Sequence, residues 1–196
     1  MNIGIDIDGF LTDIATFQLI EGKRYFRNIV NPNGYSIRDI YNCSKKDEIK
    51  FWTKNIKYYF ENARPLAKEF INYLHDNDNK IYIITSRAFT SDNTMLGAFM
   101  RHNVKRWLNK NNIYFDEILF CGEDKLDVIK KYNISIMGED KPKNVIDISN
   151  HIPVICMSAP YNNDIKKANV YKISSFDEAF DTYNTIKNTH SKKKIA

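Results

Sequence analysis

The sequence predicts an α/β protein built on a doubly wound parallel sheet. Short apolar runs alternate with amphipathic, helix-like stretches along most of the chain, and this alternation is typical of a parallel sheet with helices on both faces. Two of the runs, KIYIIT at 80–85 and PVICM at 153–157, read as strands that are buried on both faces. In sheets of this class the functional site lies beyond the carboxyl ends of the strands.

The expected elements follow in order along the chain. Strands are predicted at Ile3–Ile7, Lys80–Thr85, Glu117–Cys121, Ser135–Met137, Pro153–Met157 and Val170–Ile173. Helices are predicted over residues 64–77, 91–112, 124–132, 141–150 and 174–188. Pro65 lies near the first helical position of the first of these helices, where proline is favoured. The last helix opens with serines and with acids in its first turn, which is a helix-start signal.

One segment, residues 14–64, breaks the alternation and is expected to be an inserted helical cap. It contains the loop NPNGYS and a helix that starts at Ser44, with Asp47 at the capping-box position. Its aromatic residues are Phe17, Tyr25, Phe26, Tyr35, Tyr41, Phe51, Trp52, Tyr58, Tyr59 and Phe60. The core is then expected to comprise residues 1–13 and 65–190, and residues 191–196 are expected to form a flexible tail.

The composition of the chain limits which binding partners and which cellular location are expected. A net charge of +5 over 196 residues suits an anionic small molecule, but it lacks the clustered basic face that binds nucleic-acid polymers. No apolar stretch approaches membrane-spanning length, and the N-terminus shows no signal-peptide pattern. The three cysteines, Cys43, Cys121 and Cys156, lack zinc or disulfide spacing. We therefore expect a cytoplasmic protein without a membrane partner; an oligomer is possible.

Two groups of charged residues stand where predicted strands end. Asp6 and Asp8 close the first strand in IGIDIDGFLTD. On a continuing strand both would point to one face, and two acids packed there repel each other unless a cation or a proton separates them. The tetrapeptide GEDK follows two later apolar runs, at Gly122–Lys125 and Gly138–Lys141. The two copies are a repeat, a coincidence or two parts of one site.

The pattern DxDGxxTD after an N-terminal strand resembles the first motif of the haloacid dehalogenase superfamily of phosphatases. The resemblance implies that Asp6 is the nucleophile that accepts the phosphoryl group and that Asp8 is the general acid/base. The residue types suit this chemistry. A carboxylate attacks phosphorus only when a divalent cation and donors neutralise the phosphate oxygens. A second carboxyl group protonates the leaving oxygen and then deprotonates the attacking water.

The same resemblance implies which residues bind the phosphate. The family's second motif is a strand that ends in Thr or Ser, which assigns Thr85, and with less support Ser86, to the phosphate. The alternative for this hydroxyl is a plain N-cap before the next helix. Family order places a lysine before the final acid pair. Lys125, from the first GEDK copy, is therefore expected to bind phosphate, and Glu123 and Asp124 are expected to be helix-start acids.

The second GEDK copy is expected to complete a magnesium site. The resemblance implies Mg²⁺ ligands from Asp6, the backbone carbonyl of Asp8, and Asp140; magnesium takes few protein ligands and keeps several waters. Glu139 is expected to support the site by orienting Lys125 or a metal-bound water. Lys141 is expected to be a surface lysine, although it could also touch an anion.

Most of the chain resembles the bacterial 5′(3′)-deoxyribonucleotidase group. The similarity is carried by YSIRDIY…FW in the cap, followed by ARPLAKEFINYL, IYIITSR, VKRWLNKNNIYFDEILF, DK, IMGEDKPKN and APYN. The implied activity is a Mg²⁺-dependent phosphomonoesterase with an aspartyl-phosphate intermediate, acting on nucleoside monophosphates. One alternative is a phosphatase of a sugar phosphate or another small metabolite. Another is a non-catalytic regulatory or accessory protein on the same fold. Three departures from the family pattern occur. Phe10 stands where a small or β-branched residue is common, Gly138 where a larger apolar residue is common, and RPLA where the family has PGA at the entry to a helix.

Three residues are expected to contact the substrate. Phe17 and Tyr25, near the start of the cap, could stack on a nucleobase. They could equally belong to a small core within the cap. Arg87 follows the second motif and could bind substrate, or it could form a surface salt bridge.

Overall fold

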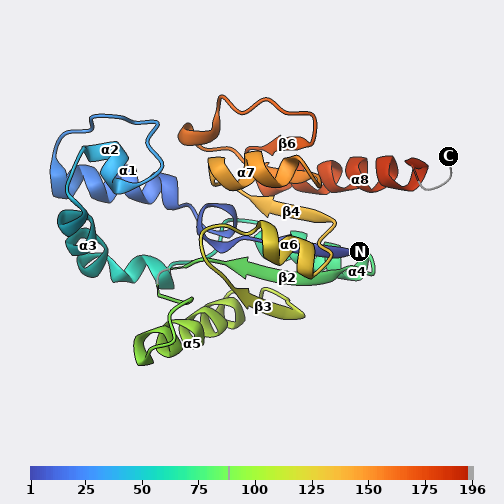
Figure 1. Ribbon diagram of the computed structural model, residues 1–196, viewed down its shortest axis with the longest axis horizontal. Helices are drawn as coiled ribbons and strands as arrows, with labels where there is room; N and C mark the ends of the chain where they lie inside the picture. The colour runs from blue at the N-terminus through green and yellow to red at the C-terminus, as the bar shows by residue number, and fades with distance from the viewer. Residues whose placement is uncertain (88, 194–196) are drawn as a thin grey trace.

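The computed structural model describes residues 1–87 and 89–193. Within them, six parallel strands form one sheet in the order β3-β2-β1-β4-β5-β6 (Figure 1). The strands are β1 (Asn2–Ile5), β2 (Lys80–Thr85), β3 (Glu117–Phe120), β4 (Ile136–Glu139), β5 (Val154–Met157) and β6 (Val170–Ile173). The predicted α/β, doubly wound class is confirmed. Strand order reverses at β1, so the crevice at the carboxyl ends of β1 and its neighbours is the expected site.

Helices cover both faces of this sheet. The helices of the core are α4 (Ala67–Asp76), α5 (Met95–Lys110), α6 (Leu126–Lys131), α7 (Pro142–Ser149) and α8 (Phe176–Lys193). Alternate residues of a strand point to opposite faces. Ile81 and Ile83 of β2 therefore pack in a cluster with α4, α5 and α8, whereas Tyr82 and Ile84 pack with α6 and α7.

Several predicted boundaries differ from the structure, among them the end of the fourth strand, which runs to Glu139 instead of Met137. The first strand ends at Ile5 rather than at Ile7, because the chain turns into the short helical segment η1 (Ile7–Leu11). Gly9 within it has φ +99° and lies against Asp140, where an added Cβ would come within 1.9 Å of a carboxylate oxygen. At the other end of the chain, α8 runs through residues 191–193, for which a tail was predicted. Residues 194–196 lie outside the described part of the chain.

Helix α4 also starts later than expected. It begins at Ala67, after Leu66 in a left-handed conformation with φ +61°. Pro65 therefore precedes the helix instead of occupying its first turn. The predicted start of the cap helix at Ser44 agrees with the structure, since the Ser44 hydroxyl accepts the Asp47 backbone N–H at 3.2 Å.

Residues 14–64 form a group of helices beyond the carboxyl ends of the strands (Figure 1). These are α1 (Ile14–Phe26), α2 (Ile37–Tyr41), α3 (Lys45–Lys54) and the short segment η2 (Ile56–Phe60). They share an apolar cluster of their own, formed by Phe17, Ile37, Ile40, Tyr41, Phe51 and Tyr58. We call this segment the cap and the remainder the core.

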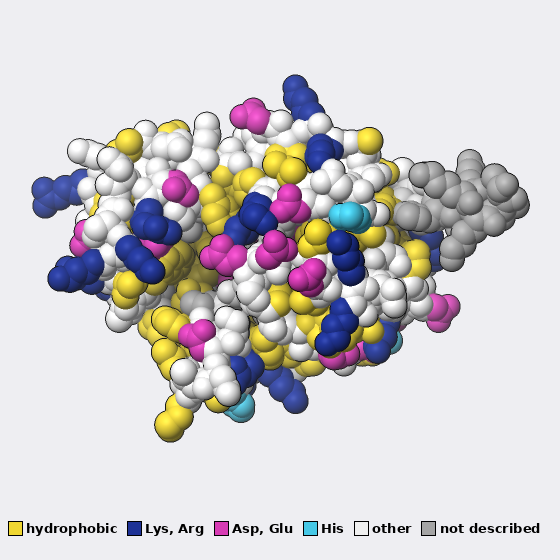
Figure 2. All heavy atoms as spheres, viewed as in Figure 1, with side chains coloured by type: hydrophobic (Ala, Val, Ile, Leu, Met, Phe, Trp, Pro, Cys, Tyr) yellow, Lys and Arg dark blue, Asp and Glu magenta, His cyan; other side chains and the backbone are white. Residues whose placement is uncertain are grey.

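The surface between the two parts is hollowed, and positive side chains are scattered among negative ones across the visible face (Figure 2). None of the helices in the described ranges has the length and apolar character required to cross a membrane.

Two of the departures from the family pattern, Phe10 and Gly138, meet in space. A Cβ added at Gly138 on β4 would lie 2.6 Å from two ring carbons of Phe10. Phe10 is fully buried and packs edge-on against Phe176, with ring centroids 5.3 Å apart. The large residue at position 10 thus occupies the volume that a larger residue at position 138 would need, and the two departures compensate for each other.

Candidate active site

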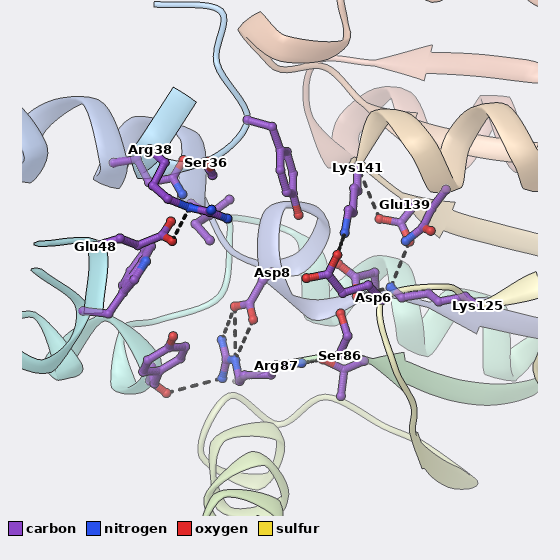
Figure 3. Close-up of a pocket in the computed structure, with 18 residues that line it drawn as sticks. Asp6, Asp8, Ser36, Arg38, Glu48, Ser86, Arg87, Lys125, Glu139 and Lys141 are labelled. Carbon is purple, nitrogen blue, oxygen red and sulfur yellow. Dashed lines mark hydrogen bonds and ion pairs between the residues drawn. The ribbon is translucent and has the colours of Figure 1, made fainter. Parts of the chain in front are cut away.

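A cavity of about 360 Å³ opens between the carboxyl ends of the strands and the cap (Figure 3). Its core lining includes Asp6, Asp8, Thr85, Ser86, Arg87, Glu123, Lys125, Glu139, Lys141 and Asn144. Its cap lining comprises Ile14, Gln18, Tyr35, Ser36, Arg38, Glu48, Trp52 and Tyr59. The predicted site residues of the core therefore surround one space, with the exception of Asp140, which lies just beneath it against Gly9.

Lys125 joins the end of β1 to the end of β4. Its ammonium contacts Asp6 and donates to Glu139 Oε2 at 2.8 Å. The other oxygen of Glu139 accepts the backbone N–H groups of Asp140 and Lys141, both at 3.0 Å. All of these carboxylates and the lysine are buried. The oxygens of Glu139 are thus occupied in holding Lys125 and the start of the next loop.

Asp140 is fully buried and only half satisfied. The Tyr161 hydroxyl donates to Asp140 Oδ2. The Asn162 side-chain amide donates to the Asp140 backbone carbonyl at 2.9 Å. Asp140 Oδ1 has no hydrogen-bond partner among the described residues. A buried carboxylate oxygen without a partner destabilises the folded state. A cation bound by Asp140 together with Asp6 or Glu139 would remove that cost.

When all of its groups are ionised, this cluster carries three negative charges and one positive charge, so a cation or protons must offset the excess. Burial raises the pKa of Asp6 to about 7, against the opposing effect of Lys125. Burial, together with the negative charges of Glu139 and Asp6, holds the pKa of Asp140 well above its usual range. For Glu139, burial is outweighed by Lys125 and by the two backbone donors, so its pKa is lowered. The pKa of Lys125 is raised, because Asp6 and Glu139 outweigh the effect of burial.

These residues fit a magnesium ion. Asp6, Glu139 and Asp140 each offer an oxygen, and these three atoms lie within 4.8 Å of one another. Carboxylate oxygens in small number are the protein ligands that Mg²⁺ prefers. Because the oxygens of Glu139 already have partners, Asp6 and the free oxygen of Asp140 are the better ligands. The Asp8 side chain is outside this group, and a ligand role for its backbone carbonyl stays a prediction.

Asp8 points away from the cluster toward Arg87 (Figure 3). Arg87 donates to both oxygens of Asp8, from Nε at 3.1 and 3.0 Å and from Nη2 at 2.6 Å. The guanidinium is buried and lies over the rings of Tyr59 and Trp107, each 5.2 Å from the ring centroid. Arg87 thus lines the cavity but is neither a surface residue nor a free donor, because its strongest contacts are with Asp8. The Tyr58 hydroxyl adds a contact to Asp8 at 3.3 Å.

Thr85 and Ser86 lie at the end of β2 and line the cavity. The Thr85 hydroxyl accepts the Arg87 backbone N–H at 3.1 Å. This bond uses the oxygen as an acceptor, so the hydroxyl proton of Thr85 can still be donated to a ligand.

The structure does not bring the two predicted cap contacts to the cavity. Phe17 packs against Phe51, Trp52 and Tyr58, and Tyr25 packs against Phe26 and Phe51. The prediction of Phe17 and Tyr25 as substrate contacts is therefore corrected: both rings belong to the apolar cluster of the cap and are absent from the cavity lining.

Other aromatic residues take that place. Tyr35, Trp52 and Tyr59 line the cavity. Trp52 lies on α3 and Tyr59 on the separate short segment η2. Their seven-residue spacing could not have singled them out, because Phe51 and Tyr58 have the same spacing and lie in the apolar cluster of the cap. Tyr35 lies in the loop NPNGYS, where no periodic signal exists.

Two further residues lie at the site. Lys141, for which a surface position was expected, has a side chain that is only 15% exposed. Lys141 lines the cavity, where its ammonium donates to Glu123 at 2.8 Å and lies 5.4 Å from the centre of the Tyr35 ring. Tyr161 lies in the sequence APYN, after the fifth strand. Its hydroxyl contacts Asp140 beneath the cavity.

Comparisons with known proteins agree with this architecture. No protein-family model matches the chain. A Halalkalibacterium halodurans protein named "Putative nucleotidase BH1399" is 27% identical over 183 residues, which cover 90% of this chain and 89% of the relative. A crystal structure of β-phosphoglucomutase from Clostridium difficile matches with a TM-score of 0.57 at 18% identity, over 94% of this chain and 97% of that chain.

Two further solved structures have similar scores. A HAD (haloacid dehalogenase) hydrolase from Entamoeba histolytica matches with a TM-score of 0.52 at 18% identity, covering 90% of this chain and 94% of that chain. A D,D-heptose 1,7-bisphosphate phosphatase from B. bronchiseptica, complexed with magnesium and phosphate, matches with a TM-score of 0.52 at 12% identity, over 94% and 98%. The haloacid dehalogenase fold expected from the motif DxDGxxTD is thereby confirmed.

Proposed function

We propose that this chain, which has the fold of the haloacid dehalogenase superfamily, is a magnesium-dependent phosphatase of phosphate monoesters. One observation carries the proposal. Asp6, Lys125 and Glu139 form a buried, hydrogen-bonded group at the floor of a cavity, and beside them Asp140 presents a buried oxygen without a partner in the described chain. A nucleophile, a phosphate-binding cation and a magnesium site are thus within one cluster.

The residues have complementary roles in this reaction. Asp6 attacks phosphorus and forms an aspartyl-phosphate as the ester oxygen leaves. Lys125 binds a phosphate oxygen and keeps Asp6 in place, and Thr85 donates to the phosphate. Magnesium, held by Asp6 and Asp140 when bound, supplies further neutralisation of the phosphate oxygens.

Asp8 transfers the protons. It gives one to the leaving oxygen and later removes one from the water that hydrolyses the aspartyl-phosphate. Both of its oxygens accept hydrogen bonds from Arg87 here, so proton delivery to the leaving oxygen requires Asp8 to turn toward the substrate. Tyr58 and Arg87 approach this carboxylate from the cap and from the core, and they limit how far it can turn.

Within this class we favour a nucleoside monophosphate as the substrate. The walls of the cavity contributed by the cap include three rings, Tyr35, Trp52 and Tyr59, and stacking on such rings is how proteins commonly hold a base. A volume of about 360 Å³ lies within the usual range of small-ligand sites. The name of the Halalkalibacterium relative supports the same choice.

A sugar phosphate is the second candidate. The rim of the cavity carries polar and charged side chains suited to hydroxyl groups, among them Ser36, Arg38 and Glu48. The β-phosphoglucomutase and heptose-bisphosphate phosphatase names of the structural neighbours support it.

A screen of phosphate monoesters with Mg²⁺ separates these proposals. The purified protein is assayed for phosphate release from nucleoside 5′- and 3′-monophosphates, sugar phosphates and p-nitrophenyl phosphate, with Asp6→Asn as the control for contaminating activity. We expect Mg²⁺-dependent turnover of nucleotides. Turnover of sugar phosphates alone would support the second candidate. No turnover of any ester, p-nitrophenyl phosphate included, would favour a non-catalytic regulatory or accessory role.

A further inference from the structure

The turn after β5 holds the fully buried Asp140 at two points. This turn is the short helix η3 (Pro160–Asn162). The Tyr161 hydroxyl donates to Asp140 Oδ2, and the Asn162 side chain donates to the Asp140 backbone carbonyl and to that of Met157, both at 2.9 Å. The side chain and the backbone of Asp140 are therefore both fixed from the same short turn.

We propose that Tyr161 is a positioning residue that orients Asp140 for the metal ion, and this rests on the magnesium site of the proposed function. A carboxylate whose Oδ2 accepts from Tyr161 can rotate little about its last bond. Oδ1, the buried oxygen without a partner in the described residues, then remains available as a ligand in the cluster that Asp140 forms with Asp6 and Glu139. Groups that hold a ligand in this way commonly change metal affinity 10- to 100-fold when they are removed.

The cap takes part in this arrangement through Tyr35. The Tyr35 ring packs edge-on against Tyr161, with centroids 5.0 Å apart and an interplanar angle of 81°. Tyr35 also lines the substrate cavity and lies under the Lys141 ammonium. Tyr35 of the cap thus contacts Tyr161, which in turn contacts Asp140, the proposed metal ligand of the core. Any change in the cap that moves Tyr35 will alter how firmly Tyr161 holds Asp140.

The direct test removes a single hydroxyl. Tyr161→Phe keeps the ring and its packing against Tyr35 but deletes the donor to Asp140. Mg²⁺ affinity is measured from the rise in unfolding temperature during a Mg²⁺ titration and by calorimetry. We expect Tyr161→Phe to bind Mg²⁺ at least about tenfold more weakly than the wild type. Tyr35→Leu, which retains the hydroxyl of Tyr161, should weaken binding by a smaller factor.

Tyr41→Phe is the matched control. The Tyr41 hydroxyl is buried and donates to the backbone carbonyls of Gln18 and Leu19 at 3.1 and 3.0 Å, within the cap. Its loss should leave Mg²⁺ affinity unchanged. Equal Mg²⁺ affinity in Tyr161→Phe and the wild type would overturn the inference alone, and so would an equal loss in Tyr41→Phe. A wild-type protein that binds no Mg²⁺ would instead overturn the metal site of the proposed function and the inference with it.

Discussion

The two GEDK tetrapeptides have identical sequences and opposite environments. In the first copy the side chains of Glu123 and Asp124 are 85% and 67% exposed, and the lysine is buried. In the second copy both acids are buried, and Lys141 reaches the rim of the cavity with its side chain 15% exposed. The first copy therefore buries its lysine, whereas the second copy buries its two acids.

The difference follows from where each copy stands relative to a strand. Strand β4 runs to Glu139, so the second copy begins inside the sheet and its acids emerge at the carboxyl edge. Strand β3 ends at Phe120, so the first copy lies wholly in the following loop, and Lys125 is the last residue before α6. The distance from the strand end, and not the tetrapeptide itself, decides which side chain enters the site.

Exchanging the acids for amides should give the largest difference between the copies. Asp140→Asn removes the negative charge beside the unpartnered oxygen, and loss of a metal ligand costs several kcal/mol of transition-state stabilisation, or roughly 10³-fold or more in turnover. Asp124→Asn, on an exposed side chain, should retain wild-type turnover. Initial rates with saturating Mg²⁺ test both.

The same pair has a second readout that does not need a substrate. Mg²⁺ should raise the unfolding temperature of the wild type and of Asp124→Asn, but not that of Asp140→Asn. If Asp124→Asn loses the Mg²⁺ response and Asp140→Asn keeps it, then the two copies have been assigned the wrong way round.

Exchanging the lysines should give the next largest difference. Lys125→Met leaves Asp6 and Glu139 without their shared partner, and removal of one member of a buried ion pair costs about 3–5 kcal/mol of folding stability. Turnover should fall by roughly 10²–10³-fold, as it does when a single donor to a developing charge is lost. Lys141→Met should unfold within about 1 kcal/mol of the wild type and retain most of its turnover. Urea unfolding and initial rates measure both effects.

One result would contradict this ranking of the two lysine variants. Were Lys141→Met the more damaging of the two variants, Lys141 and not Lys125 would be the principal phosphate-binding lysine. Its place in the cavity wall makes that outcome measurable as a rise in KM.

The sequence predicted which residues gather at one edge of the sheet, whereas the roles proposed for them came from the family resemblance. Three of the predicted residues lie at or next to the end of a strand: Asp6, Thr85 and Glu139. The carboxyl ends of parallel strands lie at the same edge of a sheet. Strand ends can be recognised from runs of apolar residues, so a motif tied to a strand end is placed in space as soon as the sheet is predicted. The motif order of the resembling family then favoured Lys125 over Lys141 as the phosphate-binding lysine, and this assignment stays a prediction.

Contacts between elements far apart in sequence could not be predicted in this way. Arg87 pairs with Asp8 across 79 positions, and no local pattern in the sequence predicts that pair. The choice of Phe17 over Trp52 failed for a related reason. Both are aromatic residues on cap helices, and which ring faces the cavity depends on how α1 and α3 pack together.

The glycines of the two copies should differ by a smaller amount. A Cβ at Gly138 would meet the Phe10 ring at 2.6 Å, whereas a Cβ at Gly122 would meet nothing within 4 Å. Gly138→Ala should destabilise the protein by roughly 1–3 kcal/mol through overpacking. Gly122→Ala should be neutral or slightly stabilising, because alanine restricts the unfolded chain. Thermal unfolding resolves this difference, since 1 kcal/mol shifts the unfolding temperature by about 2–4 °C at this size.

A double variant tests the cause. Phe10→Leu creates space next to position 138, so Gly138→Ala should cost less in that background than in the wild type. Additive effects would mean that the Phe10 ring is not what excludes a side chain from position 138.

The smallest effect is expected where the two copies touch. Lys141 donates to Glu123 at 2.8 Å, but the Glu123 side chain is 85% exposed, so the pair should contribute less than about 1 kcal/mol. The hydrogen bond from Lys141 holds the pKa of Glu123 below its ordinary value of 4.5. Because the folded state favours the ionised acid, this contribution is present above pH 4.5 and is lost as the pH falls through the lowered value.

A double-mutant cycle with Glu123→Gln and Lys141→Met, followed by urea unfolding at pH 7, measures the coupling directly. It should fall toward zero in about 1 M salt, where screening acts over roughly 3 Å, and again below the folded pKa of Glu123. The buried pair of Lys125 and Glu139 should show a much larger coupling that salt changes little, because its partners are shielded from solvent. Similar couplings for the two pairs would mean that burial is not what separates the two copies of GEDK.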